Sequence, residues 1–161
     1  MSVATMLGVE DVDEPAMMEA RRRWEAWTAM EPDLSDVDNL LNLRGWTRSA
    51  DAGAKDAALR ALAKLGSSTG GDDPAATTAL TWALVPGAAT VAYRLSDLAS
   101  NIDEFVASHL WTSAKTFAWE TRRHVAASIL RDTRRGASRR IRFRSRRRRS
   151  AARSAVTDRR R

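Results

Sequence analysis

The residues best suited to chemistry in this sequence are arginines that recur at helical spacing around residue 130. Arg123, Arg131 and Arg135 belong to a row at intervals of four that Ala127 completes, and residues four apart lie on one face of an α-helix. Apolar residues occupy another side of the same segment: Val125, Ala126, Ile129 and Leu130. We therefore predict a helix over residues 120–135 that ends at Gly136 and carries an arginine stripe suited to phosphates.

A second helix is predicted just before this one, beginning at Ile102. Ser100 or Asn101 can cap it, and Asp103 and Glu104 stand in its first turn, where the helix dipole favours acidic side chains. Its apolar face has six members: Ile102, Phe105, Val106, His109, Leu110 and Phe117. The pair of amphipathic helices, with aromatic residues between them, is the segment around which we expect the chain to be organised.

The net charge of +7 conceals a division along the chain. Residues 1–130 hold 12 Lys and Arg against 18 Asp and Glu, a net charge of −6. Residues 131–161 hold 15 Arg against 2 Asp, a net charge of +13. An acidic body with a strongly basic end predicts an arm that binds a polyanion.

After Gly136 the sequence is dominated by Arg, Ser and Ala. Such a segment has too few apolar residues to bury a face, so we predict a disordered basic tail over residues 137–161. It would hold phosphates without reading sequence, through these arginines: Arg139, Arg140, Arg142, Arg144, Arg146, Arg147, Arg148 and Arg149. An acidic membrane or protein surface, or no partner at all, are the alternatives.

The rest of the chain predicts an all-α protein, a small multi-helix bundle. Residues 1–66 form an N-terminal helical region with frayed residues 1–13, residues 67–73 form a linker, and residues 74–136 form a second helical region. Helices are expected from about Glu14, from a capping box at Ser35 to near Gly45, and from Asp51 to Leu65. Six tryptophans are available for packing or for protein contacts.

The helix expected after Asp73 and Pro74 has no charged residue between Ala75 and Tyr93. A membrane span must therefore be weighed against a core helix. Several threonines, a high alanine content and the break at Pro86 make the segment weakly apolar, so the buried helix of a bundle is the better interpretation.

No group of residues predicts an enzyme. There is no cysteine, and His109 and His124 are placed on separate predicted helices, so neither a metal site nor an acid–base pair can be assembled from the sequence. We expect no cofactor, no metal and no small-molecule substrate. The absence of cysteine and of an N-terminal signal sequence favours a cytoplasmic, nucleoid-associated protein.

Residues 74–135 contain features that resemble a known family. Leu84, Val85 and Pro86 correspond to a helix with a central Leu-Pro. The run Asp103-Glu104-Phe105-Val106 corresponds to an Asp-Asp-Leu-Val-Gln-Glu helix, and the set Val125, Ala126, Ser128 and Asp132 to an Ile-Ala-x-Asn-x-x-x-Asp pattern. Together they are similar to region 2 of the sigma-70 family of bacterial RNA polymerase initiation factors, particularly its small, truncated actinobacterial members.

The resemblance implies a DNA-binding protein that acts in transcription initiation or its regulation. It implies contact of Asp103 and Glu104 with RNA polymerase, and stacking of Phe117 or Trp119 on bases of opened DNA. It also implies that five arginines bind DNA phosphates: Arg122, Arg123, Arg131, Arg134 and Arg135. Ala107 and Ser108 replace the Gln-Glu of the family motif, and both aromatic residues have a second interpretation as core residues between two helices.

Another class of function stays open. The same composition fits a non-catalytic helical scaffold. In such a protein the acidic body would bind a protein partner through exposed tryptophans, and the tail would attach nonspecifically to nucleic acid. RNA in place of DNA is a further alternative, because charge alone does not distinguish the two polymers.

Overall fold

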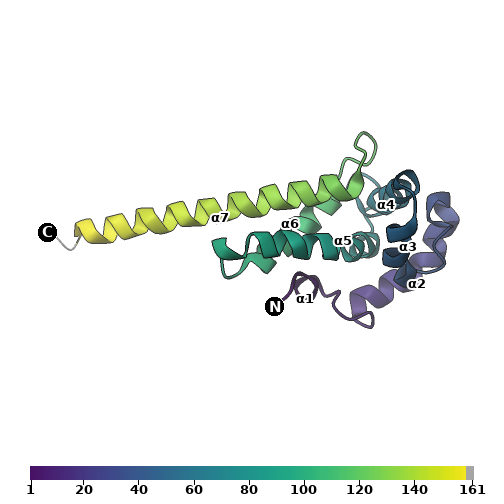
Figure 1. The fold of residues 1–161 in the computed structure, drawn as a ribbon, viewed down its shortest axis with the longest axis horizontal. Helices are drawn as coiled ribbons and strands as arrows, with labels where there is room; N and C mark the ends of the chain where they lie inside the picture. The colour runs from purple at the N-terminus through teal and green to yellow at the C-terminus, as the bar shows by residue number, and fades with distance from the viewer. Residues whose placement is uncertain (159–161) are drawn as a thin grey trace.

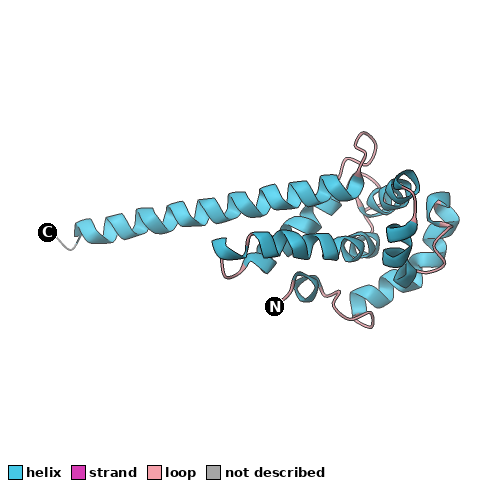
Figure 2. Cartoon of the chain, in the orientation of Figure 1, coloured by secondary structure: helices cyan, strands magenta, loops and turns pink. Residues whose placement is uncertain are grey.

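The computed structural model describes the backbone of residues 1–158 and the side chains of residues 1–147 and of Ala151. It confirms the predicted all-α class, since the described residues form helices and no strand (Figure 2). The α-helices are α1 Val3–Leu7, α2 Pro15–Met30, α3 Leu43–Ser49, α4 Ala52–Gly66, α5 Pro74–Arg94, α6 Ile102–Lys115 and α7 Val125–Asp158. Short 3₁₀ turns lie at Pro32–Leu34, Leu40–Asn42 and Ser96–Leu98.

Helix α5 is the centre of the bundle. It begins with Pro74 in its first turn, where Asp73 accepts a hydrogen bond from the backbone N–H of Ala75, and it packs against α1, α2, α4, α6 and α7. Within the described chain it is also the one helix long and apolar enough to cross a membrane. Most of that apolar stretch is buried by the other helices. Its apolar composition is therefore explained by its place in the hydrophobic core.

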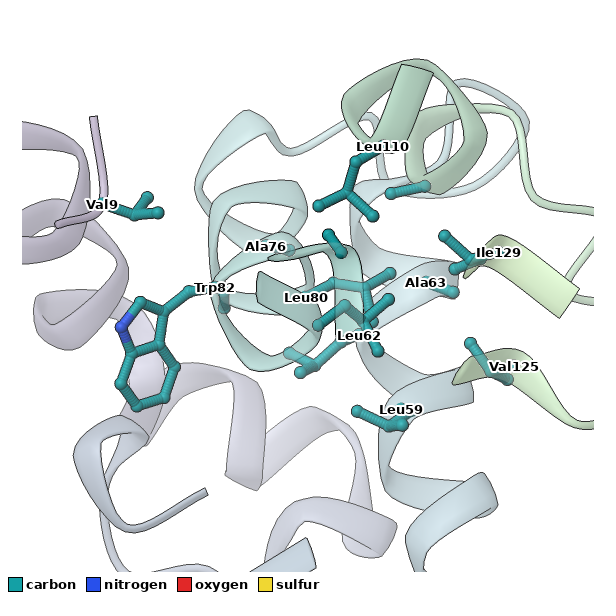
Figure 3. Packing of buried hydrophobic residues seen from close by; sticks show 14 of the residues in the cluster. Val9, Leu59, Leu62, Ala63, Ala76, Leu80, Trp82, Leu110, Val125 and Ile129 are labelled. Atoms are coloured by element: carbon teal, nitrogen blue, oxygen red, sulfur yellow. The ribbon is translucent and has the colours of Figure 1, made fainter. Parts of the chain in front are cut away.

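One hydrophobic core joins the helices. Leu62 of α4, Leu80 of α5, Leu110 of α6 and Ile129 of α7 meet in it (Figure 3). The same core includes residues from α1 and α2, so it draws on both sides of the segment 67–73. That segment is an ordered turn, in which the N–H of Gly71 donates to the carbonyl of Lys64 at 2.9 Å.

Two predictions for the N-terminal third are wrong. Residues 1–13 are not frayed, because α1 forms there and Val3 and Val9 are buried. The helix expected to end near Gly45 is instead a 3₁₀ turn followed by α3, which runs through that glycine. Leu40 and Leu43 are fully buried in this segment, so short irregular turns still deliver the apolar residues to the core.

Helix α7 begins later than predicted, at Val125 rather than near Glu120. A residue distant in sequence fixes this start: the Asp56 carboxylate on α4 accepts hydrogen bonds from the backbone N–H groups of His124, at 3.1 Å, and Val125, at 2.7 Å. A carboxylate stabilises a helix N-terminus because it satisfies free N–H groups and complements the dipole.

Helix α7 also continues through Gly136, where the sequence predicted its end. Glycine is instead needed here for close packing, because a Cβ atom at Gly136 would lie 2.3 Å from Nδ1 of His109 on α6. Beyond it, Ala137 and Ile141 are buried against the bundle. Residues 137–147 are therefore helical, not an extended coil. The predicted disorder of residues 148–161 concerns a segment whose side chains, apart from Ala151, lie outside the described residues, and it stays a prediction.

Candidate nucleic-acid interface

The exposed side of α7 carries the arginines. Residues spaced three and four apart line a shallow hollow on it: Arg131, Arg134, Arg135, Ser138, Arg139 and Arg142. We call these five arginines the arginine face. It lies opposite the buried seam of Ile129, Thr133 and Ala137, and the distance along the helix axis from Arg131 to Arg142 is about 17 Å. Packing on one side of α7 thus holds the arginines on the other.

The arginine face has no internal counter-charge. Residues 131–147 contain nine arginines and a single acid, Asp132, and among the described side chains none of the nine lies within ion-pair distance of a carboxylate. Like charges three or four residues apart destabilise a helix. A bound polyanion would relieve this repulsion, so the face is suited to binding one.

The two arginines that precede α7 differ from those on it. The Arg122 guanidinium forms an ion pair with Asp132 at 2.7 Å and lies 5.3 Å from the centre of the Phe117 ring. It already has partners, so the prediction that Arg122 holds a phosphate has no support in this geometry. Arg123 is exposed, but it stands in the loop before Val125, so the predicted row of arginines begins on the helix only at Arg131.

Four further arginines predicted to bind phosphates lie on α7 and are exposed: Arg140, Arg144, Arg146 and Arg147. Two are close to aromatic rings, with the guanidinium carbon of Arg144 at 5.4 Å from the Phe105 centroid and that of Arg147 at 5.7 Å from the Phe143 centroid. The side chains of Arg148 and Arg149 lie outside the described residues. The positive surface therefore extends beyond the arginine face toward the C-terminus.

Burial decides the role of Phe117. Only 2% of its surface is exposed, which supports the core interpretation and leaves the ring no open face on which a base could stack. Trp119 is partly buried against the same core, with its indole N–H enclosed and without a hydrogen-bond partner. Its backbone carbonyl accepts a hydrogen bond from Arg60 at 2.7 Å, so the loop that carries both aromatic residues is tied to α4.

The six tryptophans do not form the exposed cluster on which the scaffold alternative relied. Trp24, Trp27 and Trp82 are buried, and the other three, Trp46, Trp111 and Trp119, are partly buried. Trp24 donates its indole N–H to the carbonyl of Val37 at 3.0 Å. The tryptophans accordingly pack the bundle.

Asp103 and Glu104 lie in the first turn of α6, as predicted. Glu104 is exposed and accepts a hydrogen bond from the side chain of Asn101 at 3.4 Å, while Asp103 is partly buried. Asn101 occupies the N-cap position but makes no side-chain hydrogen bond to the helix N–H groups. Glu104 is thus the more accessible of the two acids.

His109 packs between α6 and α7. Its burial, and secondarily the charge of Arg140, lower its pKa below the usual value for histidine, which favours the neutral imidazole. His124 is exposed and has a positive φ of 56° at the start of α7. Among the described residues, no group of three or more His, Asp or Glu side chains is arranged to hold a metal ion.

One residue of this surface was not predicted from the sequence. Phe143 lies on α7 beside the arginine face and is 60% exposed. The signal was available, since it is the one aromatic residue within the arginine run after Gly136.

Comparisons with known proteins give no relative against which this surface can be placed. No protein-family model, no curated protein and no solved structure matches the chain.

Proposed function

We propose that this protein binds DNA through the arginine face of α7. The observation that carries the proposal is five exposed arginines on one side of a packed helix, without a carboxylate partner among the described side chains. Guanidinium groups bind phosphates with paired, charge-assisted hydrogen bonds. The arginine face lies on the side of α7 opposite the residues that pack on the bundle, and the helix continues past the bundle (Figure 1), so a long polymer can lie along the exposed side of the helix.

The binding is expected to be independent of DNA sequence. Contacts to phosphates fix position but carry no base information. Apart from arginine, the polar residues of α7 between residues 131 and 147 are Asp132, Thr133, Ser138 and Ser145. Thr133 is buried and Asp132 is paired with Arg122, which leaves two serines as the polar side chains other than arginine that could contact base edges.

The resemblance to sigma region 2 extends the proposal to transcription. In that form, Glu104 with Asp103 contacts RNA polymerase, and α7 holds DNA nearby in the cytoplasmic nucleoid. The buried Phe117 takes no part in opening the duplex. Exposure of Glu104 supports this extension, and co-purification of polymerase with the parent but not with a Glu104→Lys variant tests it.

The proposal is tested by fluorescence anisotropy with a labelled duplex between 50 and 200 mM salt. In one variant Arg134, Arg135 and Arg139 become Gln, a residue of similar helix propensity. Losing three phosphate contacts should reduce the salt slope by about 2.7, because each contributes about 0.9. Over this salt range the parent should therefore lose about 40-fold more affinity than the variant.

A control variant removes the same charge from the body. Arg22, Arg48 and Arg94 are exposed on α2, α3 and α5, and their replacement by Gln should leave the salt slope at the parent value. If both triple variants reduced the salt slope by the same amount relative to the parent, net charge, and not the arginine face, would govern binding.

A further inference from the structure

Phe143 stands in an unusual environment for an exposed aromatic residue. It follows the last buried residue of the described part of α7, Ile141, by two positions, and 60% of its surface is exposed. Residues three and four apart are neighbours on a helix surface. At Phe143 all four such positions are arginines: Arg139, Arg140, Arg146 and Arg147.

This environment favours some ligands over others. An apolar protein groove would have to accept several guanidinium groups together with a single ring. An interfacial membrane helix needs a continuous apolar face, whereas Ala137 and Ile141 are used in the core and Phe143 is the one apolar side chain among residues 142–147. A nucleotide offers both an anion for the arginines and a flat base for the ring.

The geometry leaves the ring available for stacking. The guanidinium of Arg147 lies 5.7 Å from the ring centroid, a cation–π distance, so it supports the ring from its own helix while most of the ring surface stays open to solvent. Paired bases stack on one another within a duplex, whereas unpaired bases expose their faces to aromatic side chains.

We propose that Phe143 stacks on an unpaired base, so that the arginine-rich part of α7 prefers single-stranded over duplex DNA. The inference rests on the proposed DNA binding and adds the form of DNA and the residue that selects it. The arginines hold the phosphates of either form, and Phe143 distinguishes them.

The test measures binding of the full chain to a single strand and to a hairpin duplex with the same number of phosphates. Phe143→Ala should weaken single-strand binding roughly 5- to 150-fold, the range for loss of one stacked base, and leave duplex binding unchanged. Phe143→Leu should weaken it similarly, since it keeps apolar bulk without a π-face, whereas Phe143→Tyr should retain the preference. Tyr93→Ala, at an 82% exposed position on α5, is the matched control.

The outcomes separate this inference from the proposed function. If Phe143→Ala leaves single-strand affinity unchanged, or lowers both affinities alike, stacking is overturned while DNA binding stands. Parent-like binding by Phe143→Leu would also overturn it, because the ring would then act as an apolar contact. If the parent binds neither form, or binds anionic phospholipid vesicles in preference, both proposals fail. Because the side chain is exposed, the variants should keep the parent's melting temperature, which circular dichroism checks.

Discussion

Replacing Gly136 by Ala tests how α7 is held against the bundle. A Cβ atom there would lie 2.3 Å from Nδ1 and 2.7 Å from Cγ of His109, against an ordinary contact of 3.4 Å or more. Alanine stabilises a helix interior by about 1 kcal/mol relative to glycine, but overpacking costs about 1–3 kcal/mol. We therefore expect Gly136→Ala to be neutral or to lower the free energy of unfolding by up to about 2 kcal/mol.

Gly45→Ala supplies the matched control, because nothing lies within 4 Å of a Cβ atom at this position in α3. The same substitution should stabilise the protein there by up to about 1 kcal/mol. Urea unfolding followed by circular dichroism measures both. In a His109→Ala background the penalty at Gly136 should disappear. Equal effects at the two glycines with His109 present would refute the packing role of Gly136.

Two further predictions concern the same region. Phe117→Ala should lower the free energy of unfolding by about 3–5 kcal/mol in urea titrations, as expected for a core ring; a stability loss near zero would contradict its burial. The pKa of His109 is lowered in the folded protein. At a pH between that lowered pKa and the ordinary histidine pKa, the unfolded chain therefore binds more protons than the folded protein does. The free energy of unfolding should decline as the pH falls through this range. This part of the pH dependence should vanish in His109→Gln and persist in His124→Asn; a pH profile unchanged by His109→Gln would rule out the assignment.

Local signals in the sequence identified several helices well. Asp51, where a helix was expected to begin, accepts hydrogen bonds from two backbone N–H groups at the start of α4, and Pro74 begins α5 after Asp73, as predicted. The acids at Asp103 and Glu104 marked the first turn of α6. These signals are local, because the residues that start each helix are neighbours in sequence.

Tertiary contacts decide the features that the sequence did not reveal. Gly136 suggested a helix end, yet His109 from another helix uses the space above it. Asp56 caps α7 from 69 residues away along the chain, a distance at which no capping pattern can be recognised. Val3 and Val9 are covered by the bundle, although their segment has no helical periodicity of its own.

In the candidate site, too, some features follow from local sequence and others depend on tertiary contacts. Exposure of Arg131, Arg134 and Arg135 followed from composition and spacing. The engagement of Arg122 by Asp132 did not, because it depends on the loop before α7 folding back along the helix. Exposure, which separates the buried Phe117 from the exposed Phe143, is likewise a property of the packed chain.

The most direct test of DNA binding by the arginine face is to map arginines that DNA protects from phenylglyoxal, using mass spectrometry of the modified full chain. We expect DNA to protect Arg134, Arg135, Arg139 and Arg142. The body arginines Arg22, Arg48 and Arg94 should react equally with and without DNA. Protection of the body arginines, or unchanged reactivity on α7 under conditions where DNA is bound, would contradict the proposed interface.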